Sequence, residues 1–214
     1  MRPGTHWRPA QGEPTVTVLL RHGQTPMSVQ KRYAGRSDVP LTDTGVRQAA
    51  AAAKRLASAS LGVIVSSPLL RAVQTAQEVA AVNGAAVVTD DGFREADFGA
   101  WEGMTFAEVR ERWPAELATW LADPEVAPPG GESFTGVSAR VTAALHRVLA
   151  ARAGQTVLIV SHVTPIKMLV ATALLAPPAA LYRMHLDVAA LCEIDWYADG
   201  PAVLRSFNDT GHLS

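Results

Sequence analysis

The chain carries near its start the stretch Val16-Thr17-Val18-Leu19-Leu20-Arg21-His22-Gly23-Gln24-Thr25. Its first half is apolar and rich in β-branched residues, which is typical of a buried strand. The strand pattern stops at a cation, an imidazole and a glycine. Because ligands of open α/β sheets bind beyond the carboxyl ends of the strands, we expect Arg21 and His22 to face a site there. From this pair alone, a loop whose polar groups bond only to neighbouring protein atoms is the alternative interpretation.

Two further apolar runs repeat this pattern. Val63-Ile64-Val65 is followed by Ser66-Ser67, and Val157-Leu158-Ile159-Val160 is followed by Ser161-His162. Continuous runs rich in valine and isoleucine indicate strands of a sheet whose two faces are both covered.

Helical patterns lie between and after these strands, and their ends carry capping signals such as Thr42 and Gly84. The predicted helices are Asp43 to about Ser58, a segment from Pro68 to Gly84, a segment opened by the capping-box pattern Thr105-Phe106-Ala107-Glu108 and broken by Pro114, Phe134 to Arg152, and Thr164 to Leu174. Ala190 to Trp196 and Val203 to Phe207 predict a terminal hairpin. The alternation predicts a three-layer α/β/α sandwich with a mainly parallel sheet and an antiparallel edge.

The composition predicts one compact domain over residues 16–214, preceded by a flexible tail or linker at residues 1–15. Of the 214 residues, 48% are hydrophobic and 18% are charged, and the formal net charge is −1. The basic residues are dispersed, so we expect neither nucleic acid nor a membrane surface as the main partner. The single cysteine, Cys192, excludes an intrachain disulfide and suits a reducing cytoplasm. No apolar run approaches membrane-spanning length.

Two histidines and two arginines are predicted to meet at one edge of the sheet. His22 and His162 each follow a strand, and Arg71 lies in the first turns of the helix after Ser66-Ser67. The start of that helix adds amide donors and the positive end of a dipole. Since arginine binds phosphate oxygens with paired donors, the cluster formed with Arg21 predicts a phosphate site.

These residues belong to a set of motifs that resembles the histidine phosphatase superfamily, in its phosphoglycerate-mutase-like branch. The resemblance extends over residues 16–208, with the motifs in the order of the family. They are Leu20-Arg21-His22-Gly23-Gln24-Thr25, Arg36-Ser37-Asp38-Val39-Pro40-Leu41-Thr42 with Gly45 and Gln48-Ala49, Ser67-Pro68-Leu69 with Arg71-Ala72 and Thr75-Ala76, Arg94-Glu95 with Phe98-Gly99 and Trp101-Glu102-Gly103, Gly131-Glu132-Ser133, and Val160-Ser161-His162. The resemblance implies a phosphoglycerate-mutase-like fold.

The resemblance also implies a role for each catalytic residue. His22 would attack phosphorus and form a transient phosphohistidine, Arg21, Arg71 and His162 would bind the phosphoryl oxygens, and Glu95 would protonate the leaving group. A neutral imidazole is a competent nucleophile when a backbone carbonyl holds its other nitrogen. Phosphoryl transfer depends mostly on positioning and charge stabilisation, so we expect no metal and no other cofactor.

Further residues are expected to contact the substrate. They are Gln24, Thr25, Ser28, Arg36 and Val163, with the Val163 and Thr164 amides as donors to the phosphate. A purely architectural role for Gln24, Thr25 and Arg36 is equally open. Ser28 stands where many family members carry an asparagine. Asp97 and Glu102 are alternatives to Glu95 as the proton donor.

The predicted function is a metal-independent phosphomonoesterase that acts on a small phosphorylated metabolite. The run from Leu20 to Leu41 is similar to α-ribazole phosphatase domains fused behind a ribonuclease H domain, which implies α-ribazole 5′-phosphate as substrate. Broad acid phosphatase activity is the less specific form of this prediction. The segment from Glu95 to His162 is shorter than in glycolytic mutases, which favours hydrolysis over phosphoglycerate-mutase-type transfer. A binding module without turnover and a metal hydrolase are the alternatives from other classes.

Variable loops are expected to form the pocket for the leaving group. These loops are Met27 to Asp38 and Met104 to Gly131, and the Pro- and Gly-rich stretch Asp123 to Glu132 is either a lid or an inert surface crossing. Several aromatic residues either stack on a ring-bearing substrate or belong to the core. They are Tyr33, Trp101, Phe106, Trp113 and Trp120.

Overall fold

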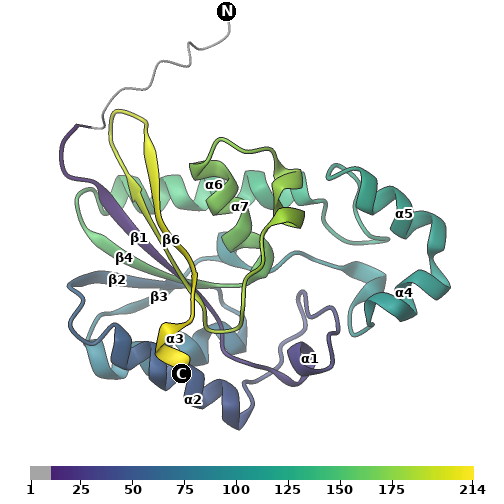
Figure 1. Ribbon diagram of the computed structural model, residues 1–214, viewed down its shortest axis with the longest axis horizontal. Coiled ribbons are helices and arrows are strands. Elements are labelled where there is room, and N and C mark those ends of the chain that lie inside the picture. The colour runs from purple at the N-terminus through teal and green to yellow at the C-terminus, as the bar shows by residue number, and fades with distance from the viewer. Residues whose placement is uncertain (1–10) are drawn as a thin grey trace, which may run out of the picture.

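A computed structural model describes residues 11–214, which form a six-stranded sheet with the order β3-β2-β4-β1-β5-β6 (Figure 1). The strands are β1 Thr15–Arg21, β2 Leu61–Ser66, β3 Val87–Thr89, β4 Thr156–Ser161, β5 Leu191–Trp196 and β6 Ala202–Asp209. The first four are parallel to one another, whereas β5 is antiparallel to both β1 and β6. The predicted parallel sheet with an antiparallel edge is confirmed. Residues 1–10 of the predicted tail lie outside the described residues.

Helices cover both faces of the sheet. They are α1 Pro26–Val29, α2 Asp43–Arg55, α3 Leu70–Asn83, α4 Phe106–Arg112, α5 Pro114–Ala122, α6 Phe134–Ala151 and α7 Val163–Ala173, with the 3-10 turns η1 Asp91–Phe93, η2 Gly99–Trp101, η3 Pro178–Arg183 and η4 Gly211–Leu213. None of the helices in residues 11–214 is long and apolar enough to cross a membrane. Successive side chains of a strand point to opposite faces. Accordingly, Val18 and Leu20 belong to the core that includes α2 and α3, and Leu19 to the core that includes α6 and α7. The three-layer sandwich is confirmed.

The ends of the helices follow local signals in the sequence. Thr42 caps α2 by accepting a hydrogen bond from the Gly45 amide at 3.0 Å. Thr105 and Glu108 form the predicted capping box of α4. Gly84 ends α3 with a φ of 82°, a left-handed conformation that glycine adopts at little steric cost.

Two local predictions differ from the structure, and one strand was not predicted. Helix α2 ends at Arg55 rather than near Ser58, because the chain turns there to enter β2. Pro114 ends one helical segment as predicted, but it also begins α5, since a proline at the first helical position removes no helical hydrogen bond. The edge strand β3 has only three residues, too few for a periodic pattern to indicate it.

The carboxyl ends of β1 and β4 lie side by side. Arg21 is opposite Ser161 in the parallel register, so His22 and His162 leave the sheet at the same edge. The His22 amide also donates to the Ser161 carbonyl at 3.0 Å. Helices α4 and α5 stand apart from the sheet, to one side of it (Figure 1). This edge of the sheet holds the candidate site.

Candidate active site

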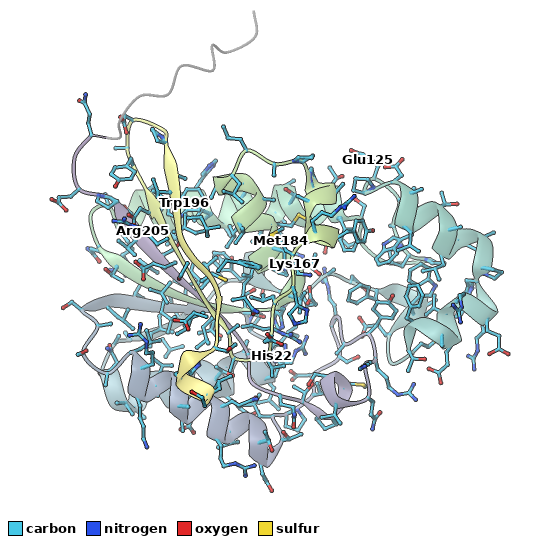
Figure 2. The ribbon with its side chains drawn as sticks, viewed as in Figure 1. His22, Glu125, Lys167, Met184, Trp196 and Arg205 are labelled. Carbon is cyan, nitrogen blue, oxygen red and sulfur yellow. The ribbon has the colours of Figure 1, made fainter. Side chains whose placement is uncertain are left out.

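His22 lies directly beyond β1 and is only 6% exposed (Figure 2). Its Nδ1 lies 2.8 Å from the Gly23 carbonyl oxygen. Because a carbonyl can only accept, this nitrogen carries the proton. Nε2 therefore keeps its lone pair, which accepts from Arg71 Nε at 3.3 Å. The imidazole has the orientation that a nucleophile requires, with Nε2 as the reactive atom.

Two glycines shape the turn that follows His22. A Cβ on Gly23 would collide with the Gly45 carbonyl oxygen, and a Cβ on Gly45 would collide with that of Gln24. The Gly23 amide also donates to Thr75 Oγ1 on α3 at 3.2 Å. The turn is therefore held between α2 and α3 by close backbone contact that no larger residue permits.

Arg71 is 1% exposed and binds mainly protein atoms. Its Nη1 donates to the Ser37 carbonyl at 2.7 Å, and Nη2 donates to the carbonyls of Ala34 and Gly35 at 2.6 and 2.8 Å. Its Nε faces His22. The paired contact with phosphate expected from the sequence is not available while these bonds hold. Arg71 instead joins the loop of residues 34–37 to the candidate nucleophile.

Two buried polar atoms of this cluster have no hydrogen-bond partner within residues 11–214. They are Arg21 Nε and His162 Nδ1. Arg21 Nη1 donates to the Leu186 carbonyl at 2.7 Å, and His162 Nε2 lies 2.7 Å from Ser67 Oγ. The ring centroids of His22 and His162 are 5.0 Å apart. Since an unpartnered buried polar atom is costly, this cluster is suited to a polar ligand.

Glu95 lies between η1 and η2 and meets the start of α7. Its Oε1 accepts from the Ala96 amide at 2.8 Å and from the Thr164 amide at 3.3 Å. The Thr164 amide belongs to the first turn of α7, whose N–H groups have no partner within the helix. The Thr164 amide therefore holds the carboxyl group in place at the start of α7.

Burial and nearby arginines keep both histidines neutral. Burial lowers the pKa of His22 well below its ordinary value, and the charges of Arg71 and Arg21 lower it further. The pKa of His162 is also lowered well below its ordinary value, mainly by burial and then by Arg71. Burial lowers the pKa of Arg21 to about 10, which leaves the guanidinium charged at neutral pH. The site combines a neutral nucleophile with cationic surroundings.

A cavity of about 230 Å³ opens beside His22. It is lined by Arg21, His22, Thr25, Ser28, Arg32, Tyr33, Ala34, Glu95, Phe98, Val163 and Thr164. Most of the predicted catalytic and substrate-binding residues are on this lining. The exceptions are Arg71 and His162, which are buried next to His22, and Gln24 and Arg36.

Gln24 and Arg36 have architectural contacts. The Gln24 side chain accepts from the hydroxyl of Thr42, the cap of α2, at 2.9 Å. Arg36 forms an ion pair with Asp97 at 3.4 Å and lies 4.0 Å from Glu132. The structure therefore favours the architectural alternative for these two residues over substrate contact.

Ser28 and Thr25 line the cavity but also cap α1. The Ser28 hydroxyl accepts from the Thr25 amide at 2.9 Å and donates to the Thr25 carbonyl at 2.8 Å. Thr25 Oγ1 accepts from the Ser28 amide at 3.1 Å. These bonds engage the Ser28 hydroxyl as both donor and acceptor, whereas the Thr25 hydroxyl only accepts and keeps its own O–H for another partner.

The alternative proton donors are engaged elsewhere. Glu102 accepts from the Arg36 amide at 2.8 Å, and Asp97 accepts from the Gly99 amide at 2.9 Å. Neither carboxyl group lines the cavity, whereas Glu95 does. The geometry favours Glu95 as the acid.

One of the two predicted loops forms the wall of the cavity. Met27 to Asp38 supplies several lining residues, but Met104 to Gly131 supplies none, and Phe98 lies on the wall instead. The prediction for the second loop was wrong because its residues form α4, α5 and their connections beside the sheet. The stretch Asp123 to Glu132 packs on η2, with the Pro129 carbonyl accepting a backbone hydrogen bond at 2.9 Å, and contributes nothing to the lining.

Tyr33 is the one candidate stacking residue that lines the cavity. Its ring centroid lies 4.7 Å from that of Phe98. Burial raises the pKa of Tyr33 to about 12, so its hydroxyl stays neutral. Trp101 and Trp120 are 0% and 5% exposed and belong to the core, as the alternative interpretation held.

Arg140 on α6 was not predicted as part of the site. Its Nη2 lies 3.5 Å from the Glu95 carbonyl oxygen and 2.7 Å from Glu132. The sequence did contain a signal. Arg140 lies next to the apolar stripe of its helix, which includes Val137, Val141 and Ala144. A charged group beside a buried stripe usually has an oppositely charged partner.

A sheet that presents a neutral histidine among arginines at its carboxyl edge defines an α/β enzyme that handles phosphate. The sequence pattern of the histidine phosphatase superfamily, branch 1, matches residues 17–210. The chain therefore belongs to the histidine phosphatase superfamily, as its motifs indicated.

Two relatives illustrate the range of the family. A bifunctional protein of Mycobacterium tuberculosis is 50% identical over 208 residues, which cover 97% of this chain and 57% of that protein. A probable phosphoglycerate mutase of Proteus mirabilis is 36% identical over 204 residues, which cover 92% of this chain and 94% of that protein. The chain thus spans little more than half the length of its mycobacterial relative.

Solved structures share the whole fold. A mycobacterial glucosyl-3-phosphoglycerate phosphatase superposes with a TM-score of 0.84 at 30% identity, covering 92% of this chain and 99% of that chain. A proposed α-ribazole-5′-phosphate phosphatase of Escherichia coli superposes with a TM-score of 0.85 at 27% identity, covering 92% and 97%. Family and neighbours support the predicted enzyme class, a histidine phosphatase. The fusion to a ribonuclease H domain stays a prediction.

Proposed function

We propose that the protein hydrolyses phosphomonoesters through a phosphohistidine formed on His22. The observation that supports this most is the state of the imidazole. Nδ1 is held by the Gly23 carbonyl at 2.8 Å, and Nε2 keeps a lone pair 3.3 Å from Arg71 Nε. A neutral and oriented imidazole beside cations attracts a phosphate group and is able to attack it.

The reaction has two steps, and residues on the cavity wall supply the nucleophile and transfer the protons in both. First, Nε2 of His22 bonds to phosphorus while the ester P–O bond breaks, and the departing oxygen takes a proton from Glu95. Next, water attacks phosphorus, the N–P bond breaks, and the Glu95 carboxylate takes a proton from the water. The products are an alcohol and inorganic phosphate, and both side chains return to their starting states.

The buried donors would stabilise the charge that develops on the phosphoryl oxygens. Arg21 Nε and His162 Nδ1 have no partners within residues 11–214, which supports this role. A neutral imidazole has one N–H, so His162 donates from Nδ1 only when the Ser67 hydroxyl donates to its Nε2. We infer that Ser67 selects this tautomer. The Val163 and Thr164 amides would add donors from the start of α7.

The proposed chemistry uses arginine charge where other phosphatases use metal ions. Within residues 11–214, no three His, Cys, Asp or Glu side chains gather as a ligand set. Independence from metal stays a prediction, and it is tested by carrying out every assay with and without excess chelator.

We propose that the leaving group is a neutral alcohol that carries a ring. Tyr33 and Phe98 form an aromatic wall, and the lining contains one cation besides Arg21, namely Arg32, which is ion-paired with Glu108 at 2.8 Å. Stacking on such a wall favours a flat ring. These features suit α-ribazole 5′-phosphate, whose leaving group is an uncharged riboside, better than the anionic phosphoglycerates.

We also propose that residues 16–214 act as one phosphatase unit in the reducing cytoplasm. Two observations support this. The six strands form a continuous sheet, and Cys192 is a buried thiol whose pKa burial raises to about 11, which makes it unreactive.

The central test is to trap the covalent intermediate. Replacing His22 with asparagine removes the nucleophile, so we expect kcat/KM to fall by at least about 10³-fold. Rapid mixing of enzyme and substrate, an alkaline quench and intact-protein mass spectrometry should detect the phosphoryl adduct in the wild type but not in His22→Asn. His146→Asn, which changes an exposed histidine on α6, is the matched control. Normal turnover by His22→Asn would exclude this mechanism.

A panel of esters tests the proposed leaving group. We expect kcat/KM for α-ribazole 5′-phosphate to exceed that for 3-phosphoglycerate and phosphoserine by at least about tenfold. Stacking contributes about 0.5–1.5 kcal/mol, and apart from Arg21, which would bind the phosphoryl group, the wall offers anionic groups no free cation. Equal rates for all esters would indicate a broad acid phosphatase. Lys167 lies one turn beyond Thr164 on α7, where its charge could attract an anionic ester. A preference for anionic esters that is lost in Lys167→Met would therefore contradict the proposed leaving group. Isomerisation of 3-phosphoglycerate in the presence of bisphosphoglycerate would identify a mutase.

A further inference from the structure

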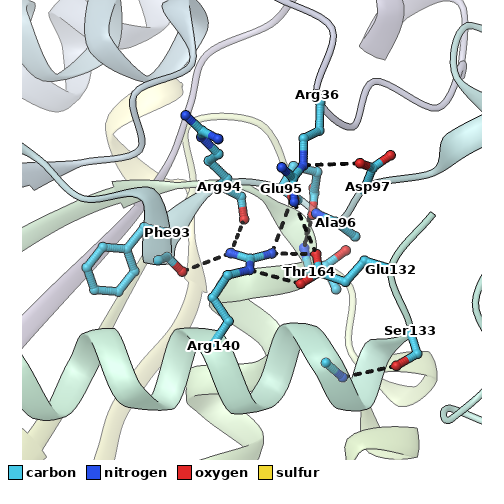
Figure 3. A network of polar contacts seen from close by, with 12 residues as sticks. Arg36, Phe93, Arg94, Glu95, Ala96, Asp97, Glu132, Ser133, Arg140 and Thr164 are labelled. Atoms are coloured by element: carbon cyan, nitrogen blue, oxygen red, sulfur yellow. Dashed lines mark hydrogen bonds and ion pairs between the residues drawn. The ribbon is translucent and has the colours of Figure 1, made fainter. Parts of the chain in front are cut away.

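The segment that carries Glu95 has little regular structure. Residues 94–98 lie between η1 and η2, so their backbone groups lack the partners that a helix or sheet provides. Arg140 on α6 supplies partners to this region. Its Nη1 donates to the Gly92 carbonyl at 2.9 Å and the Arg94 carbonyl at 3.1 Å, and Nη2 donates to the Glu95 carbonyl at 3.5 Å (Figure 3). One guanidinium therefore holds three carbonyls around the candidate acid.

Glu132 holds this guanidinium in turn. Its two oxygens accept from Arg140 Nε at 3.0 Å and Nη2 at 2.7 Å, a planar paired contact that lysine cannot reproduce. The Glu132 amide donates to the Asp97 carbonyl at 2.8 Å, and Arg36 forms an ion pair with the Asp97 side chain (Figure 3). The backbone is thus fixed on both sides of Glu95.

The ion pair lies mostly inside the protein. The side chains of Arg140 and Glu132 are 23% and 19% exposed. The segment also packs tightly on α6, since a Cβ on Gly92 would collide with the Ala144 side chain. At this depth, each charge depends on its partner. The exact path of the backbone before Glu95 therefore depends on the guanidinium.

We propose that Arg140 is a positioning residue that fixes the backbone of residues 92–95 so that the Glu95 carboxyl faces the leaving oxygen. This inference rests on the proposed function, in which Glu95 is the acid. Proton transfer requires the donor within hydrogen-bond reach of the departing atom, so a small displacement weakens it. Arg140 neither lines the cavity nor contacts His22. Its replacement should therefore slow the two steps in which Glu95 transfers a proton. Of these, kcat/KM reports the first, in which the leaving group is protonated.

The test compares two esters that differ in their need for a proton. An alkyl phosphate releases an alkoxide, which must be protonated, whereas p-nitrophenyl phosphate releases a stable anion. Arg140→Lys keeps the positive charge that acts on His162 but loses the planar pair of donors. We expect its kcat/KM to fall about 10- to 100-fold for the alkyl ester and less than about threefold for the aryl ester.

Two controls isolate the effect. Arg147 lies two turns further along α6 and is ion-paired with Asp90 at 2.8 Å, at the start of the same segment. Arg147→Lys should leave kcat/KM for both esters within about twofold of the wild type. In a Glu95→Gln background the proton donor is already absent, so Arg140→Lys should cost the alkyl ester less than about threefold more.

Equal losses for the two esters, or losses that multiply fully in the Glu95→Gln background, would overturn the inference. Turnover by His22→Asn would instead refute the proposed function, so the two failures are distinguishable. Thermal melting curves verify that each variant is folded. If Arg140→Lys does not fold, Glu132→Gln replaces it, because it removes the charge that orients Arg140 and should show the same dependence on the leaving group.

Discussion

His22 and His162 make the stability of the protein depend on pH. Burial, followed by the charge of Arg71, lowers the pKa of each imidazole well below 6.5. Above pH 6.5 the folded and unfolded chains both hold neutral imidazoles, so these residues add no pH dependence. Below pH 6.5 the unfolded chain binds protons that the folded protein does not, so the free energy of unfolding falls as the pH falls.

The expected size of this effect follows from the titration of the unfolded chain. Between about pH 7.5 and about pH 5.5 we expect each histidine to remove about 1.4 kcal/mol from the free energy of unfolding. Urea unfolding at the two pH values measures the loss. His162→Asn should reduce the loss by about 1.4 kcal/mol, whereas His146→Asn, at an exposed position, should leave it unchanged. A loss that does not depend on His162 would mean that its imidazole accepts a proton in the folded protein.

The orientation of the His22 imidazole was predictable because it depends on an immediate neighbour. The carbonyl that holds Nδ1 belongs to Gly23, the next residue along the chain. The hydrogen bonds of Arg71 to backbone carbonyls were not predictable in the same way. Its guanidinium meets carbonyls of residues 34–37, and nothing in the sequence around Arg71 indicates that this loop folds over it.

The first turn of α2 supports the loop that follows His22. Gly45→Ala places a Cβ against the Gln24 backbone, which has to move. We expect the free energy of unfolding to fall by about 1–3 kcal/mol. We also expect kcat/KM to fall about tenfold, because a small displacement of catalytic groups is enough for such a loss. Urea unfolding and steady-state kinetics of the same preparation measure both effects.

Val46→Ala provides the control for this helix. Val46 is the next residue of α2 and is 42% exposed, so its truncation should change the free energy of unfolding by less than about 0.5 kcal/mol. Wild-type stability and activity in Gly45→Ala would show that the loop accommodates a Cβ without moving His22.

Helices and strands were predictable where their signals are local. The cap at Thr42, the capping box at Thr105 and the left-handed Gly84 each act within one turn of helix. The strand β3 carries no such signal, because its three residues are a strand only through their pairing with β2. Pro114 is compatible with the end of one helix and with the start of the next. Both helices form here, because each buries apolar side chains in the core.

The arrangement of the whole molecule decides which residues line the cavity beside His22. The register of β1 beside β4 brings together two histidines 140 positions apart in the numbering, at 22 and 162, and the segment from η1 to η2 adds Glu95. Helices α4 and α5 stand to one side of the sheet (Figure 1). Residues 104–131, which include these helices, therefore do not line the cavity, whereas Phe98 does. Long-range contacts of this kind depend on strand order, which the sequence does not state.

The sequence was sufficient for the class of fold, for the family and for the enzyme class, because periodicity, capping and family motifs are encoded in residues that lie close together in the chain. It was not sufficient to show which side chains around His22 bind other protein atoms. Only folding shows that Gln24 and Arg36 bind protein atoms and that Arg140 holds the segment of Glu95. Those contacts join residues far apart in the chain, and their energies depend on burial, which exists only after the layers have packed.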